Sequence, residues 1–501
     1  MNSRARLFLG LAIGLTLPPA ATVLAQSTSD AATPINEAWV VASLKERNPS
    51  LRAAAIELEQ ASEAKRLEEG KFPYIFQADG YYTRSNTLGW NGQSSLPSSS
   101  DTLVLGSQLS RVFSTGTTAT LRAQGQYLTS QASSTQIAST PGTTEIFSLP
   151  PYQTTLRVTL TQPLLSGFGT LVNQASLRVA RMSEQKQRKT LDRQSSELLR
   201  DALLGYWEFW YSDHAVDIQI AALELAKSQQ READLRVVHG QLAAADALKF
   251  RTQVATLTES LINAEATLST SALELGRLVG IGRQAPSWKP GDEVPFLGEL
   301  PGNSIILEKL RAQSPALAEQ SEALRLAREQ RRTAGDEYRA QLNAQTWVEA
   351  EGGSGQLGSS LRQTGTMGAV GVYAGLTFIN TLDEKRLRAS RAQAAKAVAL
   401  AEANLAVTTQ QLETTALQTR QKAEQARAIL HAASVTLEVA TQQAENERQR
   451  FTLGASTPLD VQVAEDTLRQ ARLRVLRAKV DEIKARISLD HAMGELAVGR
   501  L

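Results

Sequence analysis

The sequence contains no cysteine among its 501 residues. This absence excludes disulfide bonds, thiolate metal sites, cysteine nucleophiles and a lipid-anchored N-terminal cysteine. Histidine is scarce too, and the four residues are too far apart in sequence to form an HxxH-type pair of metal ligands (His214, His239, His431 and His491). No acid-base pair or glycine-rich phosphate loop stands out either. An enzyme is therefore the function class that the sequence supports least, and we expect no cofactor and no metal.

Aromatic residues and net charge are also low. Only 5% of the residues are aromatic, and the formal net charge is +2. Such a composition offers little material for large globular cores and fits extended helices better. Because neither charge sign dominates, nothing in the composition would attract nucleic acid.

Long apolar runs are missing except near the N-terminus. A run from Leu7 to Leu17 follows two arginines and is succeeded by Val23-Leu24-Ala25. Residues 1–25 therefore have the pattern of a secretory signal peptide, and the run is too short to span a hydrocarbon core of ~30 Å. The next best stretch, 394–407, contains Lys396 and Glu402. We expect no transmembrane helix in the mature chain.

An internal repeat organises the rest of the sequence. Val158 to Gly280 aligns with Val372 to Gly494 without a gap, and a shared register brings together Arg236 with Arg450, Gly240 with Gly454, Asp246 with Asp460 and Gly280 with Gly494. Upstream, Asn48-Pro49 recurs as Ser314-Pro315 at the start of a helical run. This pattern indicates an ancient duplication in which each half reads helix, strands, long helix, turn, helix.

The helices carry the strongest periodic signal. Val254, Leu261, Leu268 and Leu275 form one row of a heptad seam, and many alanines line the corresponding seam of the second copy. The stretches Thr170–Val238 and Asp383–Leu453 contain no proline. At ~1.5 Å per residue each can extend on the order of 100 Å, a length comparable with the depth of a periplasm.

Other segments alternate between apolar and polar residues, as strands do. Leu156, Val158 and Leu160 alternate with polar residues, and residues 370–378 do so in the second half. A β-sandwich is the alternative, but it needs more core residues than these strands supply. Without an apolar helix, a chain crosses lipid only as a closed barrel. The simplest count gives four strands per chain, too few to close one, so we expect a barrel shared between chains.

A second alternating pair raises a question about strand number. The segments Leu103–Val112 and Thr118–Leu128 flank the turn Ser114-Thr115-Gly116. They either increase the count to six strands per chain or form an extracellular hairpin above the barrel. The serine-, threonine- and glycine-rich stretches 91–102 and 130–144 are expected to be exposed loops.

The sequence thus predicts an α+β membrane protein built from a duplicated helix-strand-strand-helix-helix unit. The expected segments are a signal peptide (1–25), a first N-terminal helix (26–71), first barrel strands (72–167), a first helical hairpin (168–280), a linker (281–303), a second helix (304–340), second barrel strands (341–381), a second helical hairpin (382–494) and a tail (495–501).

Two local motifs resemble a known family. The segment from Arg450-Phe451 through Gly454 to Asp460-Val461 is similar to the Arg-Tyr-x-x-Gly-x-x-x-x-x-Asp-Val signature of TolC-type outer-membrane efflux proteins. Thr161-Gln162-Pro163-Leu164-Leu165 resembles the family's turn from barrel into long helix. Phe451 departs from the usual tyrosine, and the first copy of the signature, around Arg236 and Gly240, is weaker.

The resemblance implies an assembly, a location and partners. It implies a homotrimer whose shared barrel in outer-membrane lipid continues into a coiled-coil helical barrel in the periplasm. Its function would be that of a passive gated conduit in a tripartite efflux or type I secretion system. Its partners would be a periplasmic adaptor protein and, indirectly, an inner-membrane pump or ABC exporter. The alternatives are a periplasmic adaptor and a secreted coiled-coil scaffold without a pore.

A conduit needs a closable constriction, and the sequence offers candidates. We expect Gly240 and Gly454 to lie at the tips where the long helices reverse, which would also be the docking points for the adaptor. Asp460 and Asp246 would form a cation-favouring ring around a threefold axis, or else cap the helices that follow them.

Three further residues complete the predicted gate and its surroundings. Arg236 and Arg450 would pair with nearby carboxylates and hold a closed state, or simply complement a helix dipole. Phe451 belongs to the same aperture. The barrel-to-helix turns are predicted at Pro163, Gly167 and Asn380, His239 is expected on the surface, and the cluster Trp207, Phe209, Trp210 and Tyr211 is expected to pack rather than bind a ligand.

Overall fold

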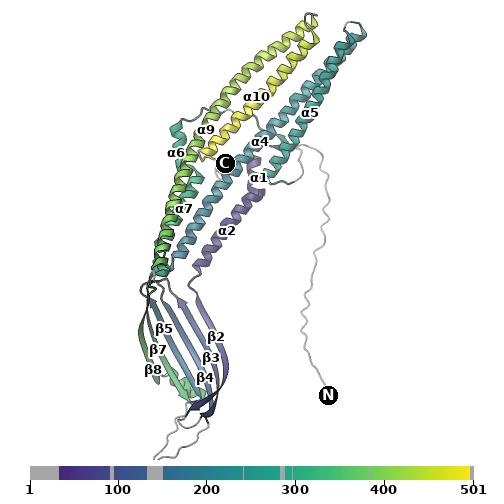
Figure 1. Cartoon of the computed structure of the whole chain (residues 1–501). Coiled ribbons are helices and arrows are strands. Elements are labelled where there is room, and N and C mark those ends of the chain that lie inside the picture. The colour runs from purple at the N-terminus through teal and green to yellow at the C-terminus, as the bar shows by residue number, and fades with distance from the viewer. Residues whose placement is uncertain are drawn as a thin grey trace, which may run out of the picture.

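The computed structural model has a sheet at one end and a long bundle of helices at the other (Figure 1). It describes residues 33–90, 95–132, 150–240, 242–282, 288–295, 297–382 and 384–496. The predicted signal peptide and all but the first two residues of the predicted tail lie outside the described residues. In the part of the chain that the structure describes, no helix is long and apolar enough to cross a membrane.

Six antiparallel strands form the sheet, in the order β2-β3-β4-β5-β7-β8. The first half of the chain supplies four of them and the second half supplies two. Their bounds are β2 (Tyr74–Trp90), β3 (Ser95–Val112), β4 (Thr118–Ala132), β5 (Tyr152–Pro163), β7 (Gln341–Ser354) and β8 (Ala369–Ile379). Within the described residues the sheet is open, with β2 and β8 as its edges.

The additional alternating pair therefore joins the sheet as β3 and β4, which gives six strands rather than a hairpin above four. The expected loop at 91–102 is wrong from Ser95 onward, because β3 pairs with β2 and, from Ser98, also with β4. Two neighbouring ladders outweigh the loop-like local composition. Of the expected loop 130–144, the first three residues belong to β4 and the remainder lies outside the described residues.

The two faces of the sheet differ in polarity. On β5, Leu156, Val158 and Leu160 lie on one face, opposite Ala350, Val348 and Thr346 of β7. The strand-to-strand register continues this apolar face through the other strands to β2 and β8. The other face carries charged and amide side chains. There Arg122 is 3.1 Å from Asp79 and donates to Gln108 at 3.4 Å, and Arg157 pairs with Glu349.

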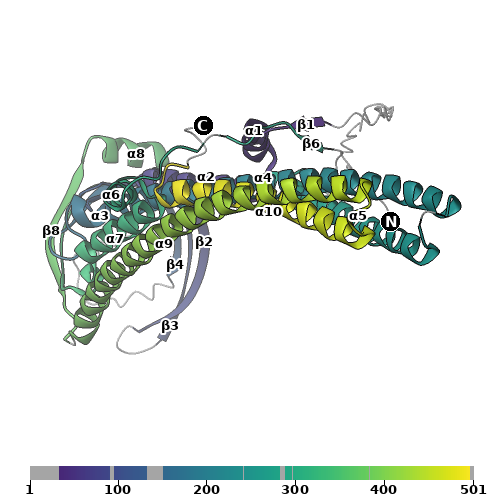
Figure 2. The same cartoon turned by 90° about the horizontal axis from the view of Figure 1, so that it is seen from above.

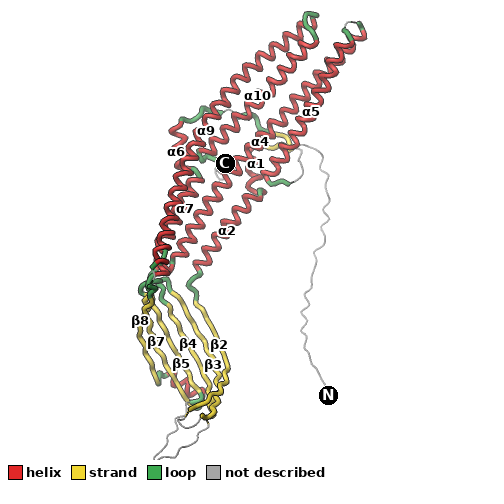
Figure 3. The backbone as a smooth tube through the Cα atoms, viewed as in Figure 1, coloured by secondary structure: helices red, strands yellow, loops and turns green. Residues whose placement is uncertain are grey.

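Two long helical hairpins extend from the strand ends (Figure 3). The first is α4 (Ala175–Val238) with α5 (Ala244–Val279), and the second is α9 (Lys385–Thr452) with α10 (Pro458–Ala492). With 64 and 68 residues, α4 and α9 are each on the order of 100 Å long. Shorter helices lie beside them: α1 (Glu37–Arg47), α2 (Pro49–Glu69), α3 (Thr170–Asn173), α6 (Asn303–Gln313) and α7 (Pro315–Thr333).

The predicted heptad seams are the contact surfaces inside each hairpin. Leu257 and Leu275 are buried in the first, and Leu468, Ala471 and Val475 are buried in the second. Small alanines allow α9 and α10 to approach closely, as the seam pattern predicts.

The duplication is visible in how each hairpin ends. Gly280 has φ 81° and packs on the Arg47–Asn48 backbone, while Gly494 has φ 78° and packs on the Gln313–Ser314 backbone. A Cβ at either position would collide with that backbone. Each half therefore closes its terminal glycine onto the start of its own Pro-initiated helix, α2 or α7.

The largest core lies midway along the bundle. The predicted linker supplies a short strand, β6 (Trp288–Pro290), that runs parallel to β1 (Thr33–Ile35). Trp288 and Ile35 pack there with Tyr206, Trp207 and other buried residues of α4. The aromatic cluster of α4 is thus mostly packing, as expected. Tyr206 donates to Asp292 at 2.9 Å and Trp210 to the Asp292 carbonyl at 3.0 Å.

One helix is not predicted by the sequence. It is α8 (Leu357–Gly365), which lies between β7 and β8 at the end of the sheet remote from the helical bundle (Figure 3). Figure 2 shows it beside β8, apart from the long helices. Its contacts are with β5 and β7.

Candidate functional site

The two hairpin tips have the same backbone geometry. Gly240 (φ 70°) and Gly454 (φ 72°) each follow the last turn of a long helix in the left-handed conformation. The N–H of Gly240 donates to the Val237 carbonyl at 3.0 Å, and that of Gly454 to the Phe451 carbonyl at 3.1 Å. Glycine adopts this conformation without steric cost, and both tips therefore reverse where the sequence predicts.

Asp460 caps α10. The Thr457 hydroxyl donates to Asp460 Oδ2 at 2.6 Å, and the Thr457 N–H donates to the same oxygen at 3.0 Å. The Asp460 N–H in turn donates to Thr457 Oγ1 at 3.3 Å, which completes a capping box. The Thr457 hydroxyl holds the pKa of the Asp460 carboxyl below its usual range. Asp460 is therefore a permanent anion at neutral pH.

Asp246 occupies the equivalent turn of α5 but has a different contact. The residue at the N-cap is Ala243, which has no hydroxyl to share with it. Asp246 Oδ1 instead lies 2.9 Å from Lys249 Nζ. The side chain is close to the N-terminus of α5, where its charge is favourable, without making the cap that Asp460 makes.

Arg450 stays within its own tip. It lies 3.3 Å from Glu447 on the same helix and donates to the Ala455 carbonyl at 3.4 Å. Glu447 also accepts a hydrogen bond from Ser456. These contacts tie the last turn of α9 to the reversing loop, and the carboxylate that Arg450 pairs with is a local one.

Arg236 makes a contact that joins the two hairpins near their tips. Its guanidinium lies 2.5 Å from Glu232 on α4 and sits over the ring of Phe451 on α9, 4.9 Å from the ring centroid. The face of the Phe451 ring takes a cation–π contact in this structure. The pair borders a cavity of about 280 Å³ that Phe250 and Val461 also line.

A second link lies beside it. Gln462 of α10 donates to the Lys249 carbonyl of α5 at 3.0 Å. Further from the tips, Arg469 of α10 donates to Gln219 of α4 at 3.3 Å, and Arg477 lies 2.8 Å from Glu208. The seam between the hairpins is therefore held near the tips by side chains that are partly open to water.

An ion pair that bridges each hairpin has opposite polarity in the two copies. In the first hairpin Asp234 of α4 lies 3.1 Å from Arg251 of α5. At the aligned positions of the second, Arg448 of α9 pairs with Glu465 of α10. No local motif in the sequence marks these residues, although the alignment of the two repeats contains the signal, because both members of the pair change sign together.

The predicted barrel-to-helix turns lie at the junction of sheet and bundle. Pro163 ends β5, and the Gly167 N–H donates to Asp336 Oδ2 at 2.9 Å. Asp336 belongs to η1 (Asp336–Tyr338), just before β7, so this bond ties the two halves together. Asn380 follows β8 and is exposed. Beside the junction, Arg178 lies 2.5 Å from the buried carboxylate of Glu329.

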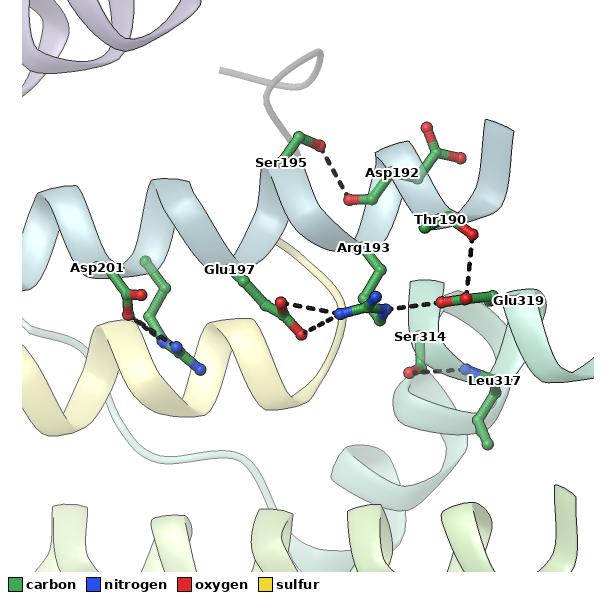
Figure 4. Close-up of polar contacts among 10 residues, drawn as sticks. Thr190, Asp192, Arg193, Ser195, Glu197, Asp201, Ser314, Leu317 and Glu319 are labelled. Carbon is green, nitrogen blue, oxygen red and sulfur yellow. Dashed lines mark hydrogen bonds and ion pairs between the residues drawn. The ribbon is translucent and has the colours of Figure 1, made fainter. Parts of the chain in front are cut away.

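Polar contacts also lock the halves together midway along the bundle (Figure 4). Arg193 of α4 lies 2.6 Å from Glu319 of α7 and 2.9 Å from Glu197. Thr190 donates to Glu319 at 3.0 Å. A cavity of about 500 Å³ lies next to these residues and is lined by His491 among others. Burial lowers the pKa of His491 to about 4, so that the imidazole is neutral at neutral pH. His239, by contrast, is exposed at a tip, as expected.

Comparison with solved structures identifies the fold. No protein-family model matches the sequence, and no curated protein matches it. Among solved structures, the CmeC outer-membrane channel of Campylobacter jejuni has a TM-score of 0.65 at 13% identity, over 97% of this chain and 94% of that one. VceC, an outer-membrane protein of Vibrio cholerae, has a TM-score of 0.62 at 14% identity, over 91% and 96%.

A third similar structure is the open state of the MtrE outer-membrane channel of Neisseria gonorrhoeae, with a TM-score of 0.64 at 15% identity over 91% of this chain and 88% of that one. The chain therefore has the fold of outer-membrane channel proteins. The resemblance to TolC-type outer-membrane efflux proteins is confirmed at the level of the fold.

Proposed function

We propose that the protein is the outer-membrane channel component of an efflux or type I secretion system, a passive gated conduit from periplasm to exterior. The observation that carries this proposal is the sheet. It has one apolar face and one polar face, two edges that are unpaired among the described residues, and strands that continue into two helical hairpins on the order of 100 Å long. The similarity to outer-membrane channels supports the same function.

Three copies of the chain would close their sheets into one barrel. A sheet with free edges exposes a row of unpaired backbone groups, which lipid does not tolerate. Pairing β8 of one copy with β2 of the next satisfies them. Three six-stranded sheets make a barrel in the size range of the ~16–18-stranded porins, whose lumen is a water-filled channel. Asp79, Arg122, Arg157 and Glu349, all on the polar face, would line it.

The hairpin tips would form the gate at the periplasmic end. In this proposal the link between Arg236 and Phe451 holds the two hairpins of one copy together in the closed state, and opening separates them. Arg450, held by Glu447, supports the tip turn next to this link. Gly240 and Gly454, at the extreme ends, would be the surface on which an adaptor's helices dock.

Asp460 and Asp246 would set the ion preference of the aperture. Threefold repetition places three carboxylates of each kind around the axis, and rings of carboxylates favour cations. The capping role of Asp460 is compatible with this one, since a capping carboxylate keeps its charge. The partners of the protein would be an adaptor protein and, through that adaptor, an inner-membrane pump or exporter.

Reconstitution tests the proposal against its alternatives. The purified protein should migrate as a heat-modifiable trimer and should conduct ions in planar bilayers. A periplasmic adaptor or a secreted coiled-coil scaffold would do neither. A stable monomer without conductance would refute the proposal.

A further inference from the structure

The unpredicted helix α8 rests on the apolar face of the sheet. The Thr154 hydroxyl is 2.8 Å from that of Ser360 and 2.6 Å from that of Thr364. Thr154 belongs to the alternating set of β5 that includes Leu156 and Val158, so its side chain points to the apolar face. The contact with α8 is therefore on the side of the sheet that would face lipid, opposite the charged face.

The packing of α8 leaves no polar group of this contact without a partner. Ser360 donates to the Gly352 carbonyl at 2.9 Å, and Thr364 donates to the Thr154 carbonyl at 3.1 Å. Gly352 lacks a Cβ where one would collide with the Ser360 carbonyl, which permits close approach. Small residues and hydrogen-bonded hydroxyls are also found where two helices pack together within membranes.

The apolar side chains of α8, and that of Met367 just after it, face outward instead. Leu357 is 49% exposed, Leu361 55% and Met367 66%, whereas Ser360 and Thr364 are buried. Met367 has φ 53°, the only non-glycine residue with a positive φ in the described part of the chain. It occupies the position after the helix where glycine is usual. Met367 therefore combines a backbone conformation that disfavours bulky residues with an exposed apolar side chain.

The position of α8 fits the edge of a lipid layer. It lies at the end of the sheet remote from the helical bundle, at the level of Tyr152, which pairs in register with Ser354. Tyr152 and Tyr127 are in contact there, with ring centroids 4.9 Å apart, and aromatic residues gather at membrane interfaces. Arg362, also exposed, supplies a positive charge for anionic headgroups.

We propose that α8 is an interfacial helix that binds the outer leaflet of the membrane, with Leu357, Leu361 and Met367 among the acyl chains and Arg362 at anionic headgroups. The proposal rests on the channel function proposed above. A neighbouring copy is the less favoured occupant, because α8 lies over β5 and β7, whereas copies meet at the edge strands β2 and β8.

Site-directed spin labelling tests this proposal directly, since the chain has no native cysteine. The trimer, in vesicles that contain phosphatidylglycerol, would carry a nitroxide at L361C, at V372C or at S359C. Val372 is 70% exposed on the apolar face of β8, and Ser359 is on the opposite side of α8 from Leu361, because residues two apart in a helix are about 200° apart.

The expected result is that labels at 361 and 372 collide several-fold more with oxygen, which partitions into lipid, than with a water-soluble nickel chelate, and that the label at 359 shows the reverse. A label at 361 as open to the chelate as that at 359 would overturn the proposal. So would one shielded from both reagents, which is the signature of a neighbouring copy. If the label at 372 were open to water, the channel proposal itself would fail along with this one.

The headgroup contact has a separate test. Replacing phosphatidylglycerol by phosphatidylcholine should reduce the oxygen-to-chelate ratio of the label at 361. In R362Q the same change of lipid should leave this ratio unaltered, because the positive charge that interacts with anionic headgroups has been removed. An equal response to lipid charge in both proteins would refute the assignment of Arg362.

Discussion

The contact between Arg236 and Phe451 allows a quantitative prediction about gating. R236Q removes the charge but keeps a long side chain, and F451L removes the aromatic face but keeps an apolar side chain against the cavity. The guanidinium is 4.9 Å from the ring centroid and its side chain is 29% exposed, so a contribution of about 1 kcal/mol per contact is reasonable.

Threefold symmetry multiplies this effect. If opening breaks the contact in all three copies together, the closed state loses about 3 kcal/mol in either variant, a shift of on the order of 100-fold in the open-to-closed equilibrium. The variant channels should therefore show a much larger open fraction in planar bilayers. The double variant R236Q/F451L should open little more than either single one, because both changes remove the same interaction.

Two controls separate this contact from its surroundings. E232Q breaks the ion pair of Arg236 on α4 but leaves the guanidinium free to cover the ring, and F250L alters the same cavity without touching the contact. Both should gate nearly as the native channel does. Unchanged gating in R236Q and F451L, or effects that simply add in the double variant, would refute the role of this contact.

Three other predictions concern selectivity, stability and pH. D460N should lower the cation-to-anion permeability ratio, and D246N should lower it too; unchanged ratios in both would remove the carboxylate ring. G280A and G494A should each destabilise the trimer by about 1–3 kcal/mol, since a left-handed residue gains a Cβ that meets backbone, and thermal unfolding measures the loss; native-like melting would contradict that packing. Because burial lowers the pKa of His491 to about 4 while the unfolded state titrates near its ordinary value of 6.5, the contribution of His491 to the pH dependence should be a loss of stability as the pH falls from 6.5 towards 4, and none above pH 6.5. In H491Q the free energy of unfolding, measured by urea titration at several pH values, should fall less steeply over this pH range. The same pH dependence in H491Q and in the native protein would contradict the role of His491.

Features that depend on local pattern could be predicted from the sequence. The repeat gave the two hairpins, and the glycines at 240 and 454 marked the tips, because a helix end and its left-handed residue are local events. The alternation around Val158 predicts a strand whose apolar residues share one face, and β5 has this arrangement. The spacing of Thr457 and Asp460 is that of a capping box, which is how the structure uses them.

Features that depend on contacts between residues far apart in the sequence could not be predicted from it. Residues 352–368 are rich in glycine and serine, poor helix formers, and α8 forms there because Ser360 and Thr364 pack on Gly352 and Thr154. The start of β3 contains Pro97 and several serines, yet it pairs with β2. The contact of Arg236 with Phe451 exists only because two hairpins far apart in sequence meet near their tips.

The central claim is that the two edges of the sheet pair between chains, and cysteine cross-linking measures this directly. The native chain offers no competing thiol, so one cysteine would be introduced on β2 and one on β8, at non-membrane-facing positions scanned along both strands. In outer-membrane fractions, oxidation should produce a ladder on denaturing gels that ends at three chains, with a closed ring as the final species. A product that remains one chain at every pair of positions, or a ladder that ends at two chains or continues beyond three, would contradict the account.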